Sequence, residues 1–409
     1  MERKVLTLAV IGGGAAGLTL ACALSEQLKN IAVFERGDRV GKKLSATGNG
    51  QGNITNEKAS VTPYFSHTQK GALRAESAIQ VFDETHLKAF YAEKGVLLLP
   101  DERGRVYPAG KQASSLTDAL RFTLEKNQVP VYTQARVTRL EKKDGIFVLT
   151  VQTADMERLF YAESVALCTG GKAAKNFGTD GSSYALAQSF GHTLTPLCPS
   201  LVQLKTETKD IKTLKGIRVA DGVLSADYNG ERLSIQGDIL FTDYGVSGDA
   251  VFRLSAFVAE KVQADGVTLS IDFLPSIDEK TLYQTLQEKA KAYPNLPASE
   301  LLFGIVNNQI GRAVMRRAEG DIKKAASLLK KFTLRANGTL GFDYAQVTKG
   351  GIPLEETDEN LQSKKAKGLY FAGEILDIDG QCGGFNLQWA YASAQTVATA
   401  ILQKTRGQV

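Results

Sequence analysis

Three glycines and an acid near the start of the sequence have the types and spacing needed to hold a nucleotide. Gly12 allows a tight turn after a strand, Gly14 lets the backbone approach a pyrophosphate, and Gly17 lets a helix pack closely on that strand. The N-terminal end of the helix carries a partial positive charge that attracts phosphates. Glu35 lies at about the twenty-residue offset where an acid accepts ribose hydroxyls. The pattern predicts a dinucleotide with an unphosphorylated adenosine ribose, such as FAD or NAD.

The segments around this turn are predicted to form the strands and the helix that such a pocket requires. An apolar run that ends at Ile11 is typical of a buried parallel strand, and leucines recur at helical spacing from Leu20 to Leu28. A second apolar run, residues 31–34, precedes Glu35. A lone glycine motif is weak evidence in a chain with 39 glycines, because an ordinary strand-to-helix turn looks the same. The order of strand, turn, helix, strand and acid favours the nucleotide pocket.

A second loop, residues 40–56, is too rich in glycine, asparagine and threonine for a helix or a central strand. Its backbone amides and polar side chains can bracket a long polar ligand that extends from the first pocket. A solvent-exposed loop is the alternative, but a ligand longer than one mononucleotide needs a second contacting loop. The further residues of these two segments that we expect to contact the cofactor are Ala15, Ala16, Arg36, Lys43, Thr47, Gly48, Asn49, Gly50 and Asn53.

Later strands are predicted to return the backbone to the same ligand. Residues 131–151 have two strand-like runs joined by a charged turn, and the backbone of Val137 is expected to lie along the adenine. Residues 161–168 form another apolar strand, which runs into a small-residue turn. This turn consists of Thr169, Gly170 and Gly171. It can bring the main chain against a dinucleotide, although any crossover between a strand and a helix looks similar.

The sequence changes character near residue 191 and again near residue 341. Short strands follow residue 199, with turns at Asp221–Gly222 and at Asn229–Gly230, and the second pair is typical of a type I′ hairpin. Helices are then predicted at residues 249–264, 276–293, 299–319 and 321–332. We therefore predict an α/β, Rossmann-like domain that binds a dinucleotide such as FAD or NAD, at residues 1–190 and 342–409. An inserted domain of antiparallel β structure plus helices, residues 191–341, would interrupt it.

Composition excludes several classes of function. The net charge of +5 is modest for 409 residues and does not indicate nucleic acid or an anionic membrane. No apolar run reaches the roughly 18 to 20 residues that span a bilayer. The four cysteines are scattered and the three histidines lack metal-ligand spacing, so we expect no metal site, no disulfide framework and a cytoplasmic location. The basic helices near residues 312–331 could bind nucleic acid, but no aromatic residues interleave with their charges.

The chain resembles the two-domain FAD flavoproteins of the aminoacetone oxidase and BaiN-type bile-acid reductase family. The resemblance covers nearly the whole length and is strongest in the closing segment. The pieces that carry it are VIGGGAAG with FERG, GKKLSATGNGQGNITN, CTGG, FTDYGVSGDAVFRLS, VTKGGIPL and GLYFAGEILDIDGQCGGFNLQWAYASAQTVA. The resemblance implies FAD as the cofactor.

It also implies cofactor contacts in the closing segment, because the loop and helix after GLYFAGE lie against the isoalloxazine in such proteins. These contacts are Gly373, Glu374, Asp379, Gly384, Asn386 and Leu387. The amides of the glycine turn at 383–384 can supply a positive field at the start of the next helix. The chain departs from the usual residues of the family at Gln51–Gly52, Asp249 and Cys382, and these departures favour the oxidase branch.

Three functions follow as hypotheses. We favour an FAD amine oxidase that converts an aminoketone such as aminoacetone with O2 to a dicarbonyl such as methylglyoxal, ammonia and H2O2. The alternative is an NAD(P)H-dependent reductase of activated C=C bonds, which the lack of a second glycine fingerprint disfavours but which transient docking of NAD(P)H would allow. The third is a non-catalytic flavin-binding or RNA-associated protein. The partners would be a small-molecule substrate and O2. Tyr244 is the first residue to test for substrate contact. No catalytic residue is identified.

Overall fold

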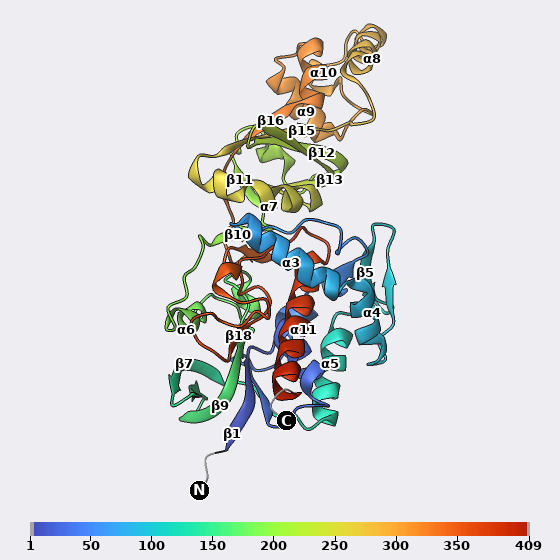
Figure 1. Ribbon diagram of the computed structural model, residues 1–409. Coiled ribbons are helices and arrows are strands. Elements are labelled where there is room, and N and C mark those ends of the chain that lie inside the picture. Colours follow the sequence, from blue (N-terminus) through green and yellow to red (C-terminus); the bar gives the residue numbers. More distant parts are fainter. Residues whose placement is uncertain (1–3, 407–409) are drawn as a thin grey trace. The chain divides into compact units, whose positions relative to one another are not determined.

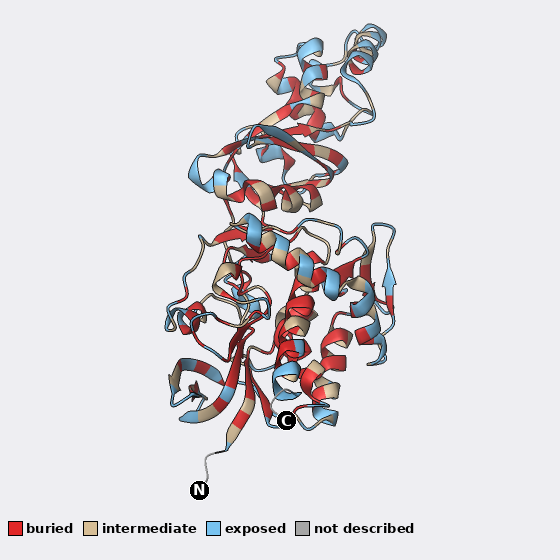
Figure 2. Cartoon of the chain, viewed as in Figure 1, coloured by how far each residue is buried: buried red, intermediate tan, exposed pale blue. Residues whose placement is uncertain are grey.

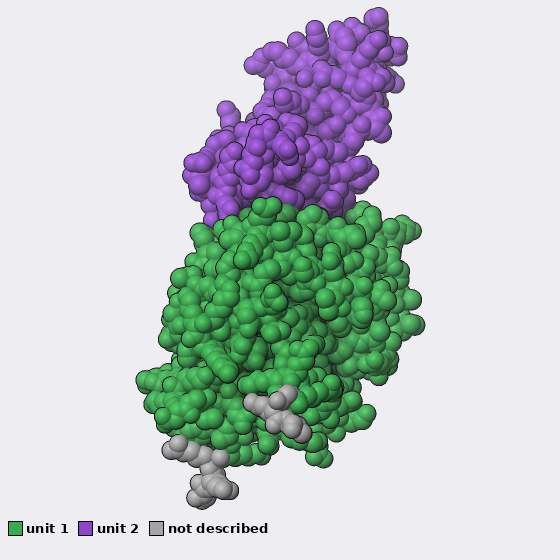
Figure 3. Space-filling view, in the orientation of Figure 1, with its two compact units in different colours: residues 1–198, 347–409 green, residues 199–346 purple. Residues whose placement is uncertain are grey.

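The computed structural model describes residues 4–406, which form two compact units (Figure 3). Unit 1 contains the residues up to 198 and those from 347 onward, and unit 2 contains residues 199–346. The strands β10 (Cys198–Ser200) and β17 (Val347–Lys349) lie where the chain passes from one unit to the other. The labels of all elements follow Figure 1. The α/β fold with an inserted, antiparallel β unit confirms the predicted fold class.

Unit 1 is built on a seven-stranded sheet with the order β6-β2-β1-β9-β8-β7, in which β18 also pairs with β9. The strands are β1 (Val5–Ile11), β2 (Ile31–Phe34), β6 (Val131–Tyr132), β7 (Arg136–Lys143), β8 (Ile146–Gln152), β9 (Glu157–Leu167) and β18 (Leu369–Phe371). The pairs that involve β1, β2, β6 and β18 are parallel, whereas β7, β8 and β9 pair antiparallel. The closing segment of the chain therefore adds a strand beside β9, next to the first glycine turn.

Helices and a small sheet complete unit 1. The helices are α1 (Ala15–Leu24), α2 (Lys42–Ser45), α3 (Gln69–Val81), α4 (Glu84–Ala92), α5 (Ser114–Lys126), α6 (Tyr184–Gln188) and α11 (Phe385–Arg406), with 3-10 turns η1 (Lys175–Phe177) and η4 (Leu354–Glu356). The small sheet has the order β3-β5-β4, formed by Thr55–Asn56, Arg105–Pro108 and Leu98–Pro100 respectively. Buried residues concentrate along β1, β9 and α11 (Figure 2), and α11 packs against α1 and α3. This packing explains the apolar runs of the sequence, because parallel strands covered by helices bury both faces.

Unit 2 is a closed antiparallel barrel that carries additional helices. The barrel order is β11-β14-β13-β12-β15-β16, with β11 (Leu204–Thr206), β12 (Arg218–Tyr228), β13 (Glu231–Phe241), β14 (Gly245–Ser247), β15 (Val267–Asp272) and β16 (Phe332–Thr339). The helices are α7 (Asp249–Ala264), α8 (Glu279–Ala292), α9 (Asn308–Arg317) and α10 (Ile322–Lys330), with 3-10 turns η2 (Lys212–Leu214) and η3 (Ala298–Glu300). Asn229 and Gly230 both have positive φ, +52° and +85°, and join β12 to β13 as the predicted hairpin turn.

Three predictions within unit 2 were wrong. Asp221–Gly222 is no turn, because β12 continues through it with a register shift between Val219 and Gly222. The single helix predicted at 299–319 is a 3-10 turn followed by the shorter α9, whose N-cap is Asn307. The helix predicted from Ser276 begins at Glu279 instead, since Asp278 is the residue whose side chain caps it. Asp221 and Gly222 lie in a β-bulge, which keeps them within the strand. The two helices begin later than predicted because a capping side chain, of Asn307 or Asp278, determines where each one starts.

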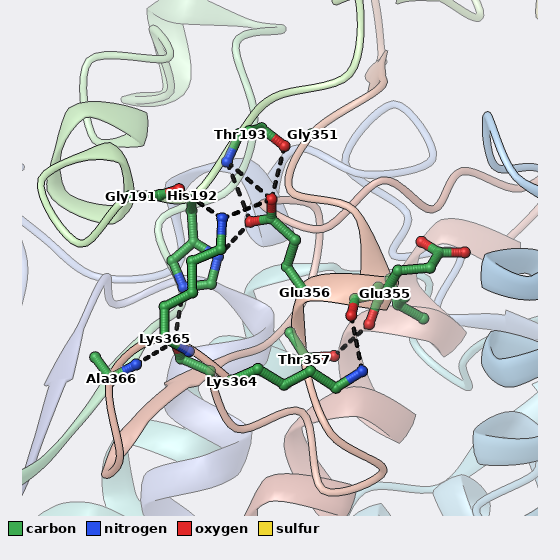
Figure 4. Close-up of polar contacts among 12 residues, drawn as sticks. Gly191, His192, Thr193, Gly351, Glu355, Glu356, Thr357, Lys364, Lys365 and Ala366 are labelled. Carbon is green, nitrogen blue, oxygen red and sulfur yellow. Dashed lines mark hydrogen bonds and ion pairs between the residues drawn. The ribbon is translucent and has the colours of Figure 1, made fainter.

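A buried polar cluster fastens the closing segment of unit 1 to residues before the insertion (Figure 4). His192 Nδ1 lies 2.6 Å from Glu356 Oε2, and its Nε2 lies 2.7 Å from Ser363 Oγ. Lys365 Nζ lies 2.8 Å from the other oxygen of Glu356, which also accepts from Thr193. Burial opposes ionisation of Glu356, but the hydrogen bonds from Lys365, Thr193 and His192 outweigh it and lower its pKa to about 2. Burial lowers the pKa of His192 against the opposite effect of Glu356.

We expect Glu356→Gln to lower the free energy of unfolding at pH 7 by on the order of 3 kcal/mol, which is the free energy that corresponds to its lowered pKa. The folded pKa lies below the unfolded value, so this stabilisation is complete above the unfolded pKa of 4.5 and is lost as the pH falls toward 2. Urea unfolding of the wild type and the variant between pH 7 and pH 3 should therefore give curves that converge at low pH. Glu359→Gln, which changes an exposed acid of the same loop, is the control. A constant gap at all pH values would contradict the linkage.

Candidate functional site

The three glycines of the first turn are required for different physical reasons. Gly12 has φ of +107°, and a Cβ there would lie 2.4 Å from the carbonyl oxygen of Cys168 at the end of β9. A Cβ on Gly17 would lie 1.9 Å from the Gly12 carbonyl oxygen, so this glycine lets α1 pack on the turn. A Cβ on Gly14 would meet no atom within 4 Å. Gly14 is also the N-cap of α1, and its cap has no side-chain hydrogen bond, so the open space lies at the helix end that attracts anions.

The acid after β2 is held in place by backbone amides. Glu35 Oε2 accepts from the Gly13 amide at 2.8 Å, and Oε1 accepts from the Gly37 amide at 2.6 Å. The carboxylate therefore sits directly behind the first glycine turn, where a ribose attached to the pyrophosphate would reach it. Arg36 points elsewhere, because its guanidinium donates to Asp180 at 2.8 Å. Its side chain is thus engaged within the protein.

The chain between β6 and β7 passes the same acid. The Ala135 amide donates to the Glu35 carbonyl at 2.9 Å, and the Gln134 amide donates to the Gly37 carbonyl at 2.7 Å. Val137 follows two residues later at the start of β7, where it is 8% exposed. This placement suits the predicted backbone contact with an adenine.

Segments from both ends of the sequence meet at Glu374. Lys43 Nζ lies 2.7 Å from Glu374 Oε2, and the Thr348 amide donates to Glu374 Oε1 at 2.8 Å. Gly171 fits closely beside them, because a Cβ there would lie 2.5 Å from the Thr348 hydroxyl and 2.9 Å from Glu374 Oε1. Gly373 packs on the first turn of α1, with its Cβ position 3.0 Å from Ala16 Cβ. The structure therefore brings the glycine turn, the second loop and the closing strand together, as the sequence predicted for one shared ligand.

Several predicted contact residues use their side chains to build the site. The Asn53 amide group donates to the carbonyls of Thr55 and Val106, and the Thr47 hydroxyl donates to the Leu44 carbonyl. These two side chains order the second loop. The amides of Gly50 and Gly52, which were expected to face the ligand, both donate to the Thr47 carbonyl within the loop. Gly48, Asn49 and Gly50 have positive φ of +58°, +54° and +82°, and a Cβ on Gly50 would meet nothing within 4 Å.

The loop before α11 is braced in the same way. Asn386 accepts from the Gly380 amide at 2.9 Å and donates to the Gly380 carbonyl at 2.8 Å, so its side chain clamps its own loop. A Cβ on Gly384 would lie 2.4 Å from the Thr55 carbonyl, which places the loop directly on β3. Asp379 is 1% exposed and Leu387 is partly buried against the core of unit 1.

Two buried hydroxyl groups have no hydrogen-bond partner in the described part of the protein and could therefore bind a polar ligand. Thr169 Oγ1 and the Tyr184 hydroxyl are buried and have no hydrogen-bond partner among residues 4–406. Thr169 was predicted to contact the cofactor. Tyr184 was missed, and no local spacing marks it. Burial first, and then the charges of Glu374 and Asp377, raise the pKa of Tyr184, so this hydroxyl stays protonated and available as a donor. The described part of the unit thus has buried donors without partners, an open glycine turn and a fixed carboxylate. These features fit the polar groups, the pyrophosphate and the ribose of FAD.

A cavity of about 490 Å³ adjoins the hairpin of β4 and β5. Its lining combines Tyr107 with three basic residues and two acidic ones, which are Arg103, Arg105, Lys111, Asp101 and Glu102. Arg105 is ion-paired with Asp101 at 2.7 Å. The Asn56 side chain of the same small sheet donates to the Gly383 carbonyl at 3.3 Å. The small sheet that carries this cavity is therefore tied to the loop that precedes α11.

The candidate substrate contact and the candidate nucleic-acid surface both lie in unit 2. Tyr244 is partly exposed, and its carbonyl accepts from the Thr206 amide. Much of the basic charge of α9 and α10 is used internally: Arg312 pairs with Glu300, and Lys330 with Asp272. Within residues 4–406, no group of three or more potential ligands is arranged for a metal ion. In the same range, no helix is both long and apolar enough to cross a bilayer.

Comparison with known proteins gives consistent matches over the whole chain. The family model described as HI0933-like protein Rossmann domain matches residues 6–400. A 3-dehydro-bile acid delta(4,6)-reductase of Clostridium scindens is 33% identical over 97% of this chain and 98% of that protein. A ribosomal RNA dihydrouridine synthase of Escherichia coli K12 is 26% identical over 96% of this chain and 97% of that protein. A 3-ketosteroid-delta4-(5alpha)-dehydrogenase from Rhodococcus jostii shares the fold with a TM-score of 0.52, at 16% identity over 97% of this chain and 98% of that one.

Proposed function

The chain belongs to the HI0933-like Rossmann-domain family, and on that premise we propose that it reduces carbon–carbon double bonds conjugated to a carbonyl group. FAD is its cofactor, and the chain is an FAD-dependent oxidoreductase. When bound, FAD supplies the capacity to accept and pass on a hydride. The open Gly14 turn would hold the pyrophosphate, Glu35 the ribose, and the segment from Gly373 to Leu387 the flavin.

The identity of the relatives carries this proposal. The protein that is 33% identical is a reductase named for the delta-4,6 bonds of a 3-dehydro bile acid, in which the double bonds are conjugated to the 3-carbonyl. The ribosomal RNA relatives make dihydrouridine, which is uridine with the double bond of its base saturated, and that bond is also conjugated to a carbonyl. Reduction of such a bond by a hydride donor would add the hydride to the carbon remote from the carbonyl and a proton to the carbon beside it. The class of bond, and not a particular substrate, is what these relatives have in common.

A reductase also needs a hydride donor, and a reduced nicotinamide dinucleotide is the donor we propose. The sequence has one glycine fingerprint followed by an acid, which the adenosine part of FAD would occupy. The donor would therefore dock transiently. The cavity beside the β4–β5 hairpin supports such docking, because the small sheet that carries it is bonded to the predicted flavin loop. Its lining also combines an aromatic ring with three basic residues against two acidic ones.

The amine oxidase predicted from the resemblance is the second candidate. The observation that favours it is the set of departures from the usual family residues at Gln51, Asp249 and Cys382. An oxidase would be reduced by a primary amine and would pass its electrons to O2. The two candidates thus differ in both the electron donor and the electron acceptor.

Product analysis separates the candidates. The FAD-loaded protein would be incubated without O2 with NADPH or NADH and either 2-cyclohexen-1-one or a 3-oxo-Δ4 steroid. We expect a saturated ketone that has gained two hydrogen atoms, formed in proportion to the nicotinamide oxidised. If neither probe is reduced, while aminoacetone under air yields methylglyoxal and H2O2, the oxidase is the correct function.

A further inference from the structure

Saturation of a conjugated double bond consumes one hydride and one proton, so the proposed function requires a proton donor in the protein. Histidine is the side chain best suited to donate a proton near neutral pH. The chain has three histidines. His192 is enclosed by Glu356 and Ser363, and His86 is an exposed residue in the first turn of α4. His67 is the remaining one, and it lies beside the closing loop of unit 1.

His67 is held by a carboxylate that is fully buried. Asp377 is 0% exposed, and its Oδ1 lies 3.0 Å from His67 Nδ1. The other oxygen of Asp377 accepts from the His67 amide at 3.0 Å and from the Ser66 hydroxyl at 3.1 Å. In a neutral ring, an adjacent carboxylate favours the tautomer that carries the proton on Nδ1. Asp377 therefore holds the His67 ring in one orientation through Nδ1.

The pair lies next to the predicted flavin contacts. The backbones of Phe65 and Asp379 pair in both directions, with N–O distances of 2.8 and 3.1 Å. Asp377 stands between Glu374 and Asp379 in the sequence, and both of these residues are predicted to contact FAD. The segment that carries His67 is thus fastened along the same loop that would face the flavin.

Tyr184 gives an independent indication of ligand space at this place. Its hydroxyl is buried and has no hydrogen-bond partner among the residues described here. The negative charges of Glu374 and Asp377 act on that hydroxyl. A buried donor without a partner marks a position where a polar group of a ligand would be bound.

We propose that His67 donates the proton in the reduction and that Asp377 is the residue that positions it. This inference rests on the proposed function. FAD, held by the Gly14 turn, Glu35 and the segment from Gly373 to Leu387, would supply the transfer of a hydride from a reduced nicotinamide dinucleotide to the β carbon of the substrate. The electron pair of the double bond forms the new C–H bond at the α carbon with the Nε2 proton of His67. The neutral imidazole then regains a proton from solvent, and the nicotinamide leaves oxidised.

The test compares the half-reactions of His67→Gln and Asp377→Asn with those of the wild type. His86→Gln is the matched control, because His86 is also bonded to an aspartate, Asp83, but on the exposed surface. Each FAD-loaded protein is reduced without O2 by NADPH and then mixed with 2-cyclohexen-1-one or a 3-oxo-Δ4 steroid. FAD content and the rate of reduction by NADPH should be unchanged, and reoxidation by the enone should fall by on the order of 10² to 10³ in His67→Gln.

The pH dependence gives a readout that a structural role would not produce. The wild-type rate of reoxidation should fall as the pH rises, as a reaction that uses a general acid requires, whereas the rate of His67→Gln should be flat over the same range. Other ionisable groups around the segment include Glu355, which is bonded to Thr68, Glu76, which is bonded to the Tyr64 amide, and Lys70. The charges of Glu374 and Asp377 also act on Tyr184. If the wild type reduces the enone and His67→Gln does so equally fast, the inference is wrong and the proposed function stands. If the wild type fails to reduce either probe, the proposed function is wrong.

A second measurement is independent of activity. With three histidines in the chain, the nitrogen signals of the oxidised holoprotein labelled with 15N-histidine can be assigned by single substitutions. We expect the neutral ring of His67 to carry its proton on Nδ1, and to lose this preference in Asp377→Asn. A neutral His67 with its proton on Nε2 in the wild type would overturn the proposed orientation.

Discussion

Replacing Gly14 by valine is expected to abolish FAD binding while leaving the fold intact. A Cβ at this position meets no protein atom within 4 Å, and the φ of Gly14 is −87°, which any residue adopts. The valine side chain would occupy the space at the N-terminus of α1 that the pyrophosphate needs. Loss of a few charge-assisted hydrogen bonds to phosphate, each worth about 1.5 to 3 kcal/mol, should weaken FAD binding by at least about 10³-fold.

The measurement is FAD affinity by flavin fluorescence, together with urea unfolding of the cofactor-free protein. Gly110→Val is the control, since Gly110 also has open space at its Cβ position and no positive φ. The control should bind FAD normally. A Gly14→Val protein that stays fully yellow would show that the nucleotide lies elsewhere.

Gly384→Ala is expected to have the second large effect, this time through the fold. Gly384 has φ of +101°, and a Cβ there would lie 2.4 Å from both the carbonyl carbon and the carbonyl oxygen of Thr55. Since β3 and the loop before α11 cannot both keep their positions, we expect the free energy of unfolding to fall by roughly 3 kcal/mol or more. The displaced loop should also weaken FAD binding.

The neighbouring glycine provides the matched comparison. Gly383 has φ of +118°, and its Cβ would approach no atom closer than 3.6 Å. Gly383→Ala should therefore show only the cost of backbone strain, on the order of 1 to 2 kcal/mol. Urea unfolding and FAD titration of both variants give the test. Equal effects of the two substitutions would mean that the contact with Thr55 is unimportant.

The sequence predicted the parts of the fold that depend on local periodicity. The buried runs at β1 and β2 and the hairpin at Asn229–Gly230 follow from side-chain pattern and turn chemistry alone. The helix that begins at Asp249 was predicted in the same way. The closed barrel could not be predicted, because its closure joins β11 to β16, strands far apart in the sequence. Asp221–Gly222 has the composition of a turn, yet pairing with β13 keeps it within a bulged strand.

The candidate site shows the same limit. Glycine positions could be predicted, because tight turns and close backbone approach restrict the residue type. The roles of side chains could not, since their partners are distant: Lys43 meets Glu374, and Asn53 bonds to Val106. His67 and Tyr184 carry no local signal either, because the residue that bonds to His67 and whose charge acts on Tyr184 is Asp377, far away in the sequence. The FAD contacts themselves stay predictions that substitution will test.

The most direct test of the proposed function compares two electron acceptors, an enone and O2, each mixed separately with the reduced protein. The protein loaded with FAD is reduced by NADPH without O2, and the flavin absorbance is followed after mixing with an enone or with oxygenated buffer. We predict fast bleaching by NADPH, fast recovery with 2-cyclohexen-1-one or a 3-oxo-Δ4 steroid, and slow recovery with O2. Bleaching by aminoacetone but not by NADPH, followed by fast recovery with O2 and release of H2O2, would contradict the reductase and identify an oxidase.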